Sequence, residues 1–92
     1  MAPFRLNILR RGEAHVAESE AGTVLGIAAS AEAAAEKTRL ALLDGLEPSS
    51  RPEMLLLRVR QPGTVIIVMQ PFEKRVRLSR TSPRKLAPEV TD

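Results

Sequence analysis

The stretch Ser30–Leu46, SAEAAAEKTRLALLDGL, decides the fold, because it has the features of an amphipathic helix. Its first residue is a good N-cap, and Glu32 places an acid in the first turn, where the helix dipole favours one. At 3.6 residues per turn the buried stripe is made mostly of small side chains, namely Ala31, Ala35, Thr38 and Leu42, widened by Ala34 and Ala41. We therefore expect a helix from Ala31 to about Asp44, ended by Gly45 in the left-handed conformation. Its alanine face predicts close docking onto a flat sheet.

Three strands are expected before this helix. Residues 4–11, FRLNILRR, alternate apolar and polar side chains, which is typical of a half-buried strand. After a turn at Gly12, residues 13–19 form a weaker strand. Either of its faces can be the buried one: Ala14 with Val16, or His15 with Ala17. Residues 23–29, TVLGIAA, form the third strand, in which Gly26 predicts a bulge or the close approach of another backbone.

Two longer strands follow a linker at residues 47–53. Met54–Arg60 and Thr64–Gln70 flank QPGT, whose Pro and Gly suit the centre of a type II turn, so a hairpin is expected. The run Val65–Met69 is apolar without a break, which predicts a central strand covered on both faces. KRVRLSR, residues 74–80, alternates again and leaves open a sixth strand at an edge. The order β-β-β-α-β-β predicts an α+β fold, a mostly antiparallel sheet with one helix packed on one face.

Composition narrows the class of protein. Ninety-two residues suffice for one domain, which we assign to residues 1–80, with a disordered basic, proline-containing tail at 81–92. The only aromatic residues are Phe4 and Phe72, so the core must be aliphatic. Cysteine is absent, which excludes disulfides and thiolate metal sites. With no apolar run of about 18 residues and no signal-peptide pattern, the expected location is the cytoplasm, without membrane association.

No residue set predicts catalysis. The only histidine, His15, has just local carboxylates and Ser19 as partners, whereas an enzyme needs a nucleophile or base together with a group that orients it. A metal site needs several converging ligands, and the five glycines are too far apart for a phosphate-binding loop. We therefore expect a protein that is not an enzyme and uses no metal, no cofactor and no small-molecule substrate.

Positive charge is concentrated in the second half of the chain. Residues 1–50 carry five basic and seven acidic side chains, whereas residues 51–92 carry nine basic and four acidic ones. Spacing by two places each arginine pair on one face of its strand, and the candidates for contacting phosphates are Arg58, Arg60, Arg75, Arg77 and Arg80. Such a patch would hold nucleic acid electrostatically, but aromatic stacking platforms are lacking. A solvated arginine face explains the same pattern.

Two leucines lie off the buried stripe of the helix. Leu40 and Leu43 fall at the edge of its polar face. Either the loop after the helix wraps them, or they contact a second chain. The second reading makes them candidates for a protein interface, including a homodimer.

Residues 4–48 resemble the HicB family of antitoxins. In that family strands lead through a G-C-V-like stretch into a Ser/Thr-capped helix and a Gly-Glu-Pro-like linker; the counterparts are AGTV at 21–24, SAEAAAEKTRLALL at 30–43 and DGLEP at 44–48. The resemblance implies a partial ribonuclease-H-like fold that lacks catalytic residues and holds a partner protein, in that family a small basic toxin that cleaves RNA. The chain departs from the family where a hairpin replaces the DNA-binding segment. We expect a protein-binding, antitoxin-like module that neutralises or scaffolds a partner, with nucleic-acid binding as the alternative.

Overall fold

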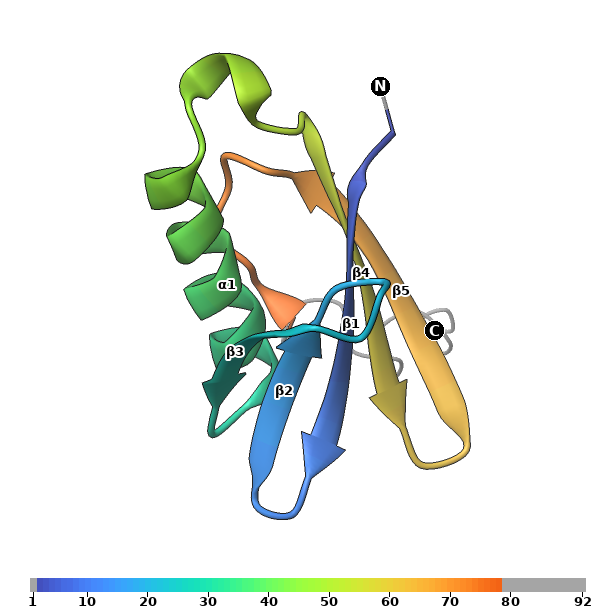
Figure 1. The fold of residues 1–92 in the computed structure, drawn as a ribbon. Helices are drawn as coiled ribbons and strands as arrows, with labels where there is room; N and C mark the ends of the chain where they lie inside the picture. The colour runs from blue at the N-terminus through green and yellow to red at the C-terminus, as the bar shows by residue number, and fades with distance from the viewer. Residues whose placement is uncertain (1, 79–92) are drawn as a thin grey trace.

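The computed structural model describes residues 2–78, so Arg80 and the predicted tail at 81–92 lie outside the described residues. Figure 1 shows a sheet with one long helix beside it. The elements are β1 (Phe4–Arg11), β2 (Ala14–Glu18), β3 (Val24–Ala28), α1 (Ala31–Gly45), a short 3₁₀ helix (Pro48–Ser50), β4 (Met54–Gln61) and β5 (Thr64–Pro71). The predicted α+β class and element order are confirmed.

The five strands form one sheet in the order β3-β2-β1-β4-β5. Three of the four strand pairs are antiparallel, and β4 runs parallel to β1. The parallel pair arises because the chain leaves β3, passes through α1 across the sheet, and re-enters beside β1. Two glycines with positive φ make the hairpin turns tight: Gly12 (φ 65°) joins β1 to β2, and Gly63 (φ 77°) joins β4 to β5, as the type II turn requires.

The helix docks closely on β1, β2 and β3, as its small side chains predict. Ala34, Ala35 and Thr38 are buried, and a Cβ added to Gly26 would overlap Thr38 Oγ1 and lie 3.1 Å from the Ala34 carbonyl oxygen. The hydroxyl of Ser30 accepts the N–H of Ala33 at 3.1 Å and so caps the helix. The prediction of a left-handed stop was wrong. Gly45 is the last helical residue without positive φ, because the N–H of Leu46 still bonds to Leu42 O and continues the helical pattern.

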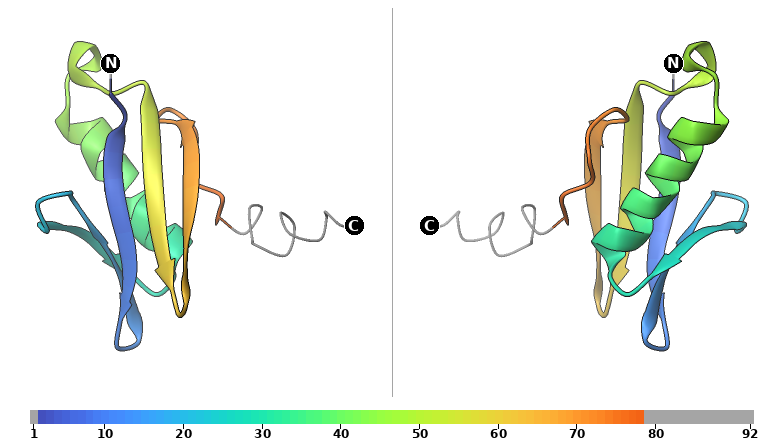
Figure 2. Two further views of the ribbon diagram at one scale, coloured as in Figure 1. Left: turned by 90° about the vertical axis from the view of Figure 1, so that its right-hand side faces the viewer. Right: turned by 90° about the vertical axis from the view of Figure 1, so that its left-hand side faces the viewer.

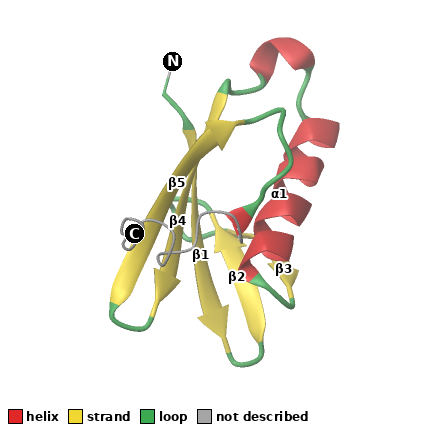
Figure 3. Ribbon diagram, turned by 180° about the vertical axis from the view of Figure 1, so that it is seen from behind, coloured by secondary structure: helices red, strands yellow, loops and turns green. Residues whose placement is uncertain are grey.

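The core lies between the sheet and the layer formed by α1 and the segment that follows β5. It consists of Leu6, Ile8, Ala17, Ala34, Ala35, Leu55, Leu57, Val59, Phe72 and Val76. Phe72 and Val76 are fully buried, since the chain turns back from the sheet edge toward α1 after β5 (Figure 3). The described residues of KRVRLSR therefore form this covering segment and no sixth strand.

Among the described strands, β5 lies at the edge of the sheet and pairs only with β4. The prediction of a central strand covered on both faces was therefore wrong. Ile66 and Val68 are half-buried beneath the covering segment, but Val65, Ile67 and Met69 are 43%, 61% and 52% exposed. A continuous apolar run indicates two apolar faces, and here only one of the two is covered.

Candidate functional site: the uncovered face of the sheet

Helix α1 covers one face of the sheet, and no helix of residues 2–78 lies on the opposite face (Figure 2). On β4 the side chains of Leu55, Leu57 and Val59 point into the core, so their neighbours in sequence point outward. The register sets each of these neighbours opposite an outward residue of β5: Leu56 with Met69, Arg58 with Ile67, and Arg60 with Val65. We call these six residues the outer patch.

The outer patch combines exposed apolar side chains with unpaired positive charge. Arg58 and Arg60 are exposed, and neither forms an ion pair within residues 2–78. By contrast, the charges on the β1–β2 half of this face are neutralised locally. Arg11 pairs with Glu18 at 2.8 Å, and Arg5 pairs with Glu20 at 3.1 Å. The exposed apolar area and the free charge therefore lie together over β4 and β5.

A second group of apolar side chains lies on the same face, over β1, β2 and β3. Val16 on β2 lies between Leu9 of β1 and Ile27 of β3 on the uncovered face. Val16 is buried by these neighbours, while Ile27 is 51% exposed. This resolves the alternative for the second strand: both Val16 and Ala17 are buried, Ala17 beneath α1 and Val16 on the uncovered face. A hollow of about 350 Å³ lies between the ends of β1 and β4, and it is lined by Leu9, Arg10, Arg60, Gln61 and Pro62.

The second arginine pair lies elsewhere. Arg75 and Arg77 belong to the segment after β5, and Arg75 lines a hollow against α1, on the covered side of the sheet. The structure thus brings Arg58 and Arg60 together but does not join them to Arg75 and Arg77 in one patch. The four-arginine surface would have required residues 74–80 to be a strand beside β4.

The two candidate leucines on α1 differ in their surroundings. Leu40 is 49% exposed and lines the hollow of about 330 Å³ that Arg75 borders. Leu43 is half-buried and packs against the core. Arg51, from the linker, donates to the carbonyl oxygens of Leu43 (2.9 Å) and Leu46 (3.3 Å), so the chain after the helix wraps its last turn. Of the two candidate leucines, Leu40 is therefore the one available as an apolar contact.

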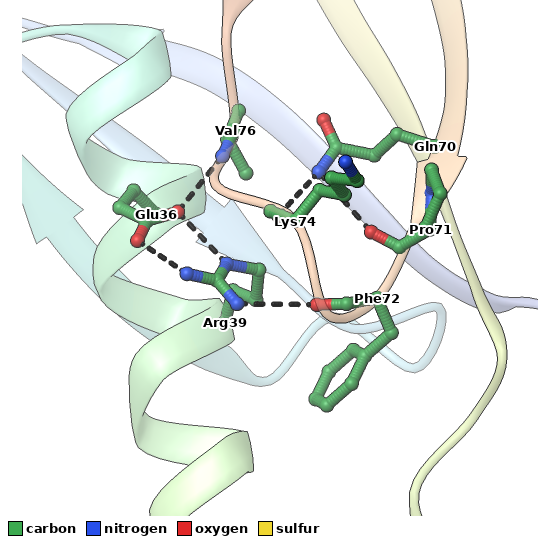
Figure 4. Close-up of polar contacts among 7 residues, drawn as sticks. All are labelled: Glu36, Arg39, Gln70, Pro71, Phe72, Lys74 and Val76. Carbon is green, nitrogen blue, oxygen red and sulfur yellow. Dashed lines mark hydrogen bonds and ion pairs between the residues drawn. The ribbon is translucent and has the colours of Figure 1, made fainter.

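An ion pair that the sequence reading did not single out fastens the covering segment to α1 (Figure 4). Arg39 donates to both carboxylate oxygens of Glu36, at 2.7 and 2.9 Å. Oε1 of Glu36 also accepts the N–H of Val76 at 2.9 Å, and Arg39 donates to the carbonyl of Phe72 at 3.2 Å. The Glu–Arg spacing of three on a helix was a local signal for the pair. Its hydrogen bonds to Phe72 and Val76 join residues far apart in the sequence, and no local pattern predicts such bonds.

Burial alone would raise the pKa of Glu36, but other effects outweigh it. The hydrogen bonds from Arg39 and from the N–H of Val76, together with the charges of Arg39 and Arg75, lower this pKa below its ordinary value of 4.5. The hydrogen bonds that Arg39 donates to Glu36 raise the pKa of Arg39. Both groups therefore stay charged near neutral pH, and the pair is a structural clamp.

No constellation of catalytic or metal-binding groups occurs in the part of the chain that the structure describes. His15 is half-buried, and its Nδ1 lies 3.2 Å from the carbonyl oxygen of Ala29. Within residues 2–78 no three His, Cys, Asp or Glu side chains are placed to bind a metal ion. The described helices include none with the length and hydropathy to span a membrane.

Comparisons of the chain with protein-family models, with curated proteins and with solved structures give no match. The outer patch therefore has to be interpreted from its own chemistry.

Proposed function

We propose that this protein is a small non-catalytic binding module that holds a partner protein on its outer patch. The observation that carries the proposal is the exposure of Val65, Ile67 and Met69 on a sheet face that no described element covers. Large apolar side chains that cluster on a surface commonly mark protein contacts. The two unpaired arginines beside them supply the polar, orienting part of such an interface.

The chemistry of the outer patch favours a partner surface that combines apolar and acidic side chains. An acidic group opposite Arg58 or Arg60 gains charge-assisted hydrogen bonds, while Leu56, Ile67 and Met69 offer the apolar area. An antitoxin-like role, in which the module neutralises or scaffolds its partner, is part of the proposal and rests on the sequence resemblance alone. The charge of the outer patch directs that role toward an acidic contact surface on the partner.

Nucleic acid is the second candidate ligand, and the free charge of Arg58 and Arg60 favours it. However, two arginines contact few phosphates, and the apolar residues between them carry no aromatic ring on which a base could stack. The four apolar residues of the outer patch would gain no contact with phosphates in such a complex. A protein partner uses the whole patch, so it is the stronger proposal.

The test is affinity purification with tagged variants, after nuclease treatment, followed by titration of the purified partner. The double variant Arg58→Glu/Arg60→Glu and the single variant Met69→Ser alter the outer patch. Arg75→Glu/Arg77→Glu is the control for charge, since it reverses two arginines of the segment after β5; urea unfolding checks that it still folds, because Arg75 acts on Glu36. We expect a stoichiometric partner that binds the wild type and the control and binds both patch variants at least tenfold more weakly.

Two results would overturn the proposal. One is a partner that binds all variants equally, which would place the interface elsewhere. The other is tight binding of mixed RNA or DNA at low salt that the Arg58→Glu/Arg60→Glu variant loses while no protein is retained. Phosphate binding weakens steeply as salt rises, so a salt titration separates that outcome from apolar protein contact.

A further inference from the structure

The outer edge of β5 carries a row of backbone groups that have no partner within residues 2–78. In a two-residue hairpin the residues that flank the turn, Gln61 and Thr64, form a hydrogen-bonded pair. Because hydrogen-bonded and non-bonded pairs alternate in an antiparallel ladder, Val65, Ile67 and Met69 direct their N–H and C=O groups away from β4. No backbone hydrogen bond outside the strands involves these three residues within residues 2–78. Three donors and three acceptors are therefore presented on one edge.

The other edge of the sheet is protected. Strand β3 has only five residues, and its pairing with β2 is interrupted by a register shift at Ala17 and Glu18. Lys37 also donates to the carbonyl oxygen of Ile27 at 3.3 Å, which occupies that edge. Shortness, bulges and lysines are the usual devices that prevent edge pairing. Strand β5 has eight residues, a continuous register and no charged side chain, and its one proline, Pro71, is its last residue and lies beyond Val65–Met69.

The sequence of β5 is symmetric in chemical character about Ile67. Reading outward from Ile67, Ile66 matches Val68, Val65 matches Met69, and Thr64 matches Gln70. A two-fold symmetric contact requires a surface that complements itself, and a strand paired antiparallel with its own copy needs this kind of sequence. Apolar residues then meet apolar residues, and the polar residues meet at the two ends.

We infer that two copies of this chain pair antiparallel through β5, with Ile67 on the two-fold axis. Ile67 then forms a hydrogen-bonded pair with Ile67 of the second copy, and Val65 pairs with Met69 in both directions. This register uses the N–H and C=O groups of Val65, Ile67 and Met69, which point away from β4. The inference goes beyond the proposed function, because it concerns the backbone edge and holds whichever partner occupies the outer patch.

Charge does not oppose this dimer. Arg58 and Arg60 lie on β4, so two β5 strands separate them from their counterparts, a distance of about 14 Å at the usual strand spacing. That separation exceeds the Debye length of about 8 Å at physiological ionic strength. The dimer also sets the two outer patches side by side on one continuous sheet face.

Disulfide trapping tests the register, since the chain has no cysteine of its own. A hydrogen-bonded antiparallel pair has Cα atoms about 5.5 Å apart, which a disulfide can bridge. Ile67→Cys, at a 61% exposed position, should therefore form a covalent dimer under mild oxidation. Val65→Cys is the matched control: its two copies lie four residues apart along the strand, about 14 Å by the strand rise, and should stay unlinked. A covalent dimer of Val65→Cys, or none of Ile67→Cys, would overturn the register.

Sedimentation of the unmodified chain tests the dimer itself. We expect a concentration-dependent dimer, and a chain still monomeric at about 1 mM, where even weak pairing is populated, would overturn the inference. Ile67→Pro removes only an outward N–H, which an edge strand tolerates, and should be monomeric. Ile67→Thr keeps that N–H and should still dimerise. Arg58→Glu/Arg60→Glu should also dimerise, so loss of the partner and loss of the dimer are separate results.

Discussion

Glu36 and Arg39, one turn apart on α1, form a two-point ion pair that joins the helix to the segment after β5. The guanidinium bonds both carboxylate oxygens, at 2.7 and 2.9 Å, and each partner also bonds the backbone of that segment. Their side chains are only 15% and 7% exposed. The pair thus fixes the chain that buries Phe72 and Val76 over the inner face of the sheet.

Removing the charge of Glu36 should destabilise the protein. In Glu36→Gln the amide keeps one acceptor, but Arg39 loses its counter-ion in a largely buried position, and hydrogen bonds to charged groups contribute about 1.5–3 kcal/mol. We expect the free energy of unfolding, measured with urea, to fall by about 2 kcal/mol. Glu20→Gln is the control, because its ion pair with Arg5 is exposed, and it should change the value by less than about 0.5 kcal/mol. Equal effects of the two substitutions would contradict the clamp.

The same ion pair predicts how stability depends on pH. The folded-state pKa of Glu36 is lowered below 4.5, so the unfolded chain binds a proton at higher pH than the folded one. The contribution of the pair is therefore complete above the unfolded pKa and is lost as pH falls through the folded pKa. Unfolding free energies of the wild type and Glu36→Gln, measured from pH 7 to pH 3, should converge only below about pH 4.5. A difference that stays constant over this range would show that the carboxylate charge is irrelevant.

Close docking of α1 depends on Gly26. A methyl group there would overlap Thr38 Oγ1, so Gly26→Ala should lower the unfolding free energy by about 1–3 kcal/mol, as overpacking does. Thr38→Ala removes the oxygen that the methyl group would meet, so the double variant should be more stable than the sum of the two single effects predicts. Gly45→Ala is the control: it has open space and should be neutral or slightly stabilising. If the changes in unfolding free energy from the two substitutions are additive, the helix moves away from the sheet to make room for the methyl group, and the close contact is not required.

Local patterns predicted the helix, the hairpins and the docking of alanines on Gly26, because caps, turn glycines and side-chain period are set by neighbouring residues. The edge position of β5 could not be predicted in this way. An apolar run looks the same whether its second face meets the core or solvent, and only the pairing partners decide between them. The residues of the candidate site also fall into a part that local spacing predicted and a part that it did not. Spacing by two placed Arg58 and Arg60 on one face, whereas Arg75 depended on a sixth strand that the described residues do not form.

Leu40 and Leu43 provide a last test, because the structure separates two residues that the sequence treats alike. Leu43 packs against the core and Leu40 is half exposed. Leu43→Ser should lower the unfolding free energy by about 1–2 kcal/mol, since a half-buried apolar side chain that packs against the core is replaced by a hydroxyl group, whereas Leu40→Ser should change it by less than about 0.5 kcal/mol. Thermal and urea unfolding measure both. If Leu40→Ser instead lowers partner affinity or dimer formation while stability is unchanged, the helix carries an interface and the outer patch is not the whole binding surface. If Leu40→Ser changes neither, binding is left to the sheet, where the exposed apolar side chains and the unpaired arginines lie together.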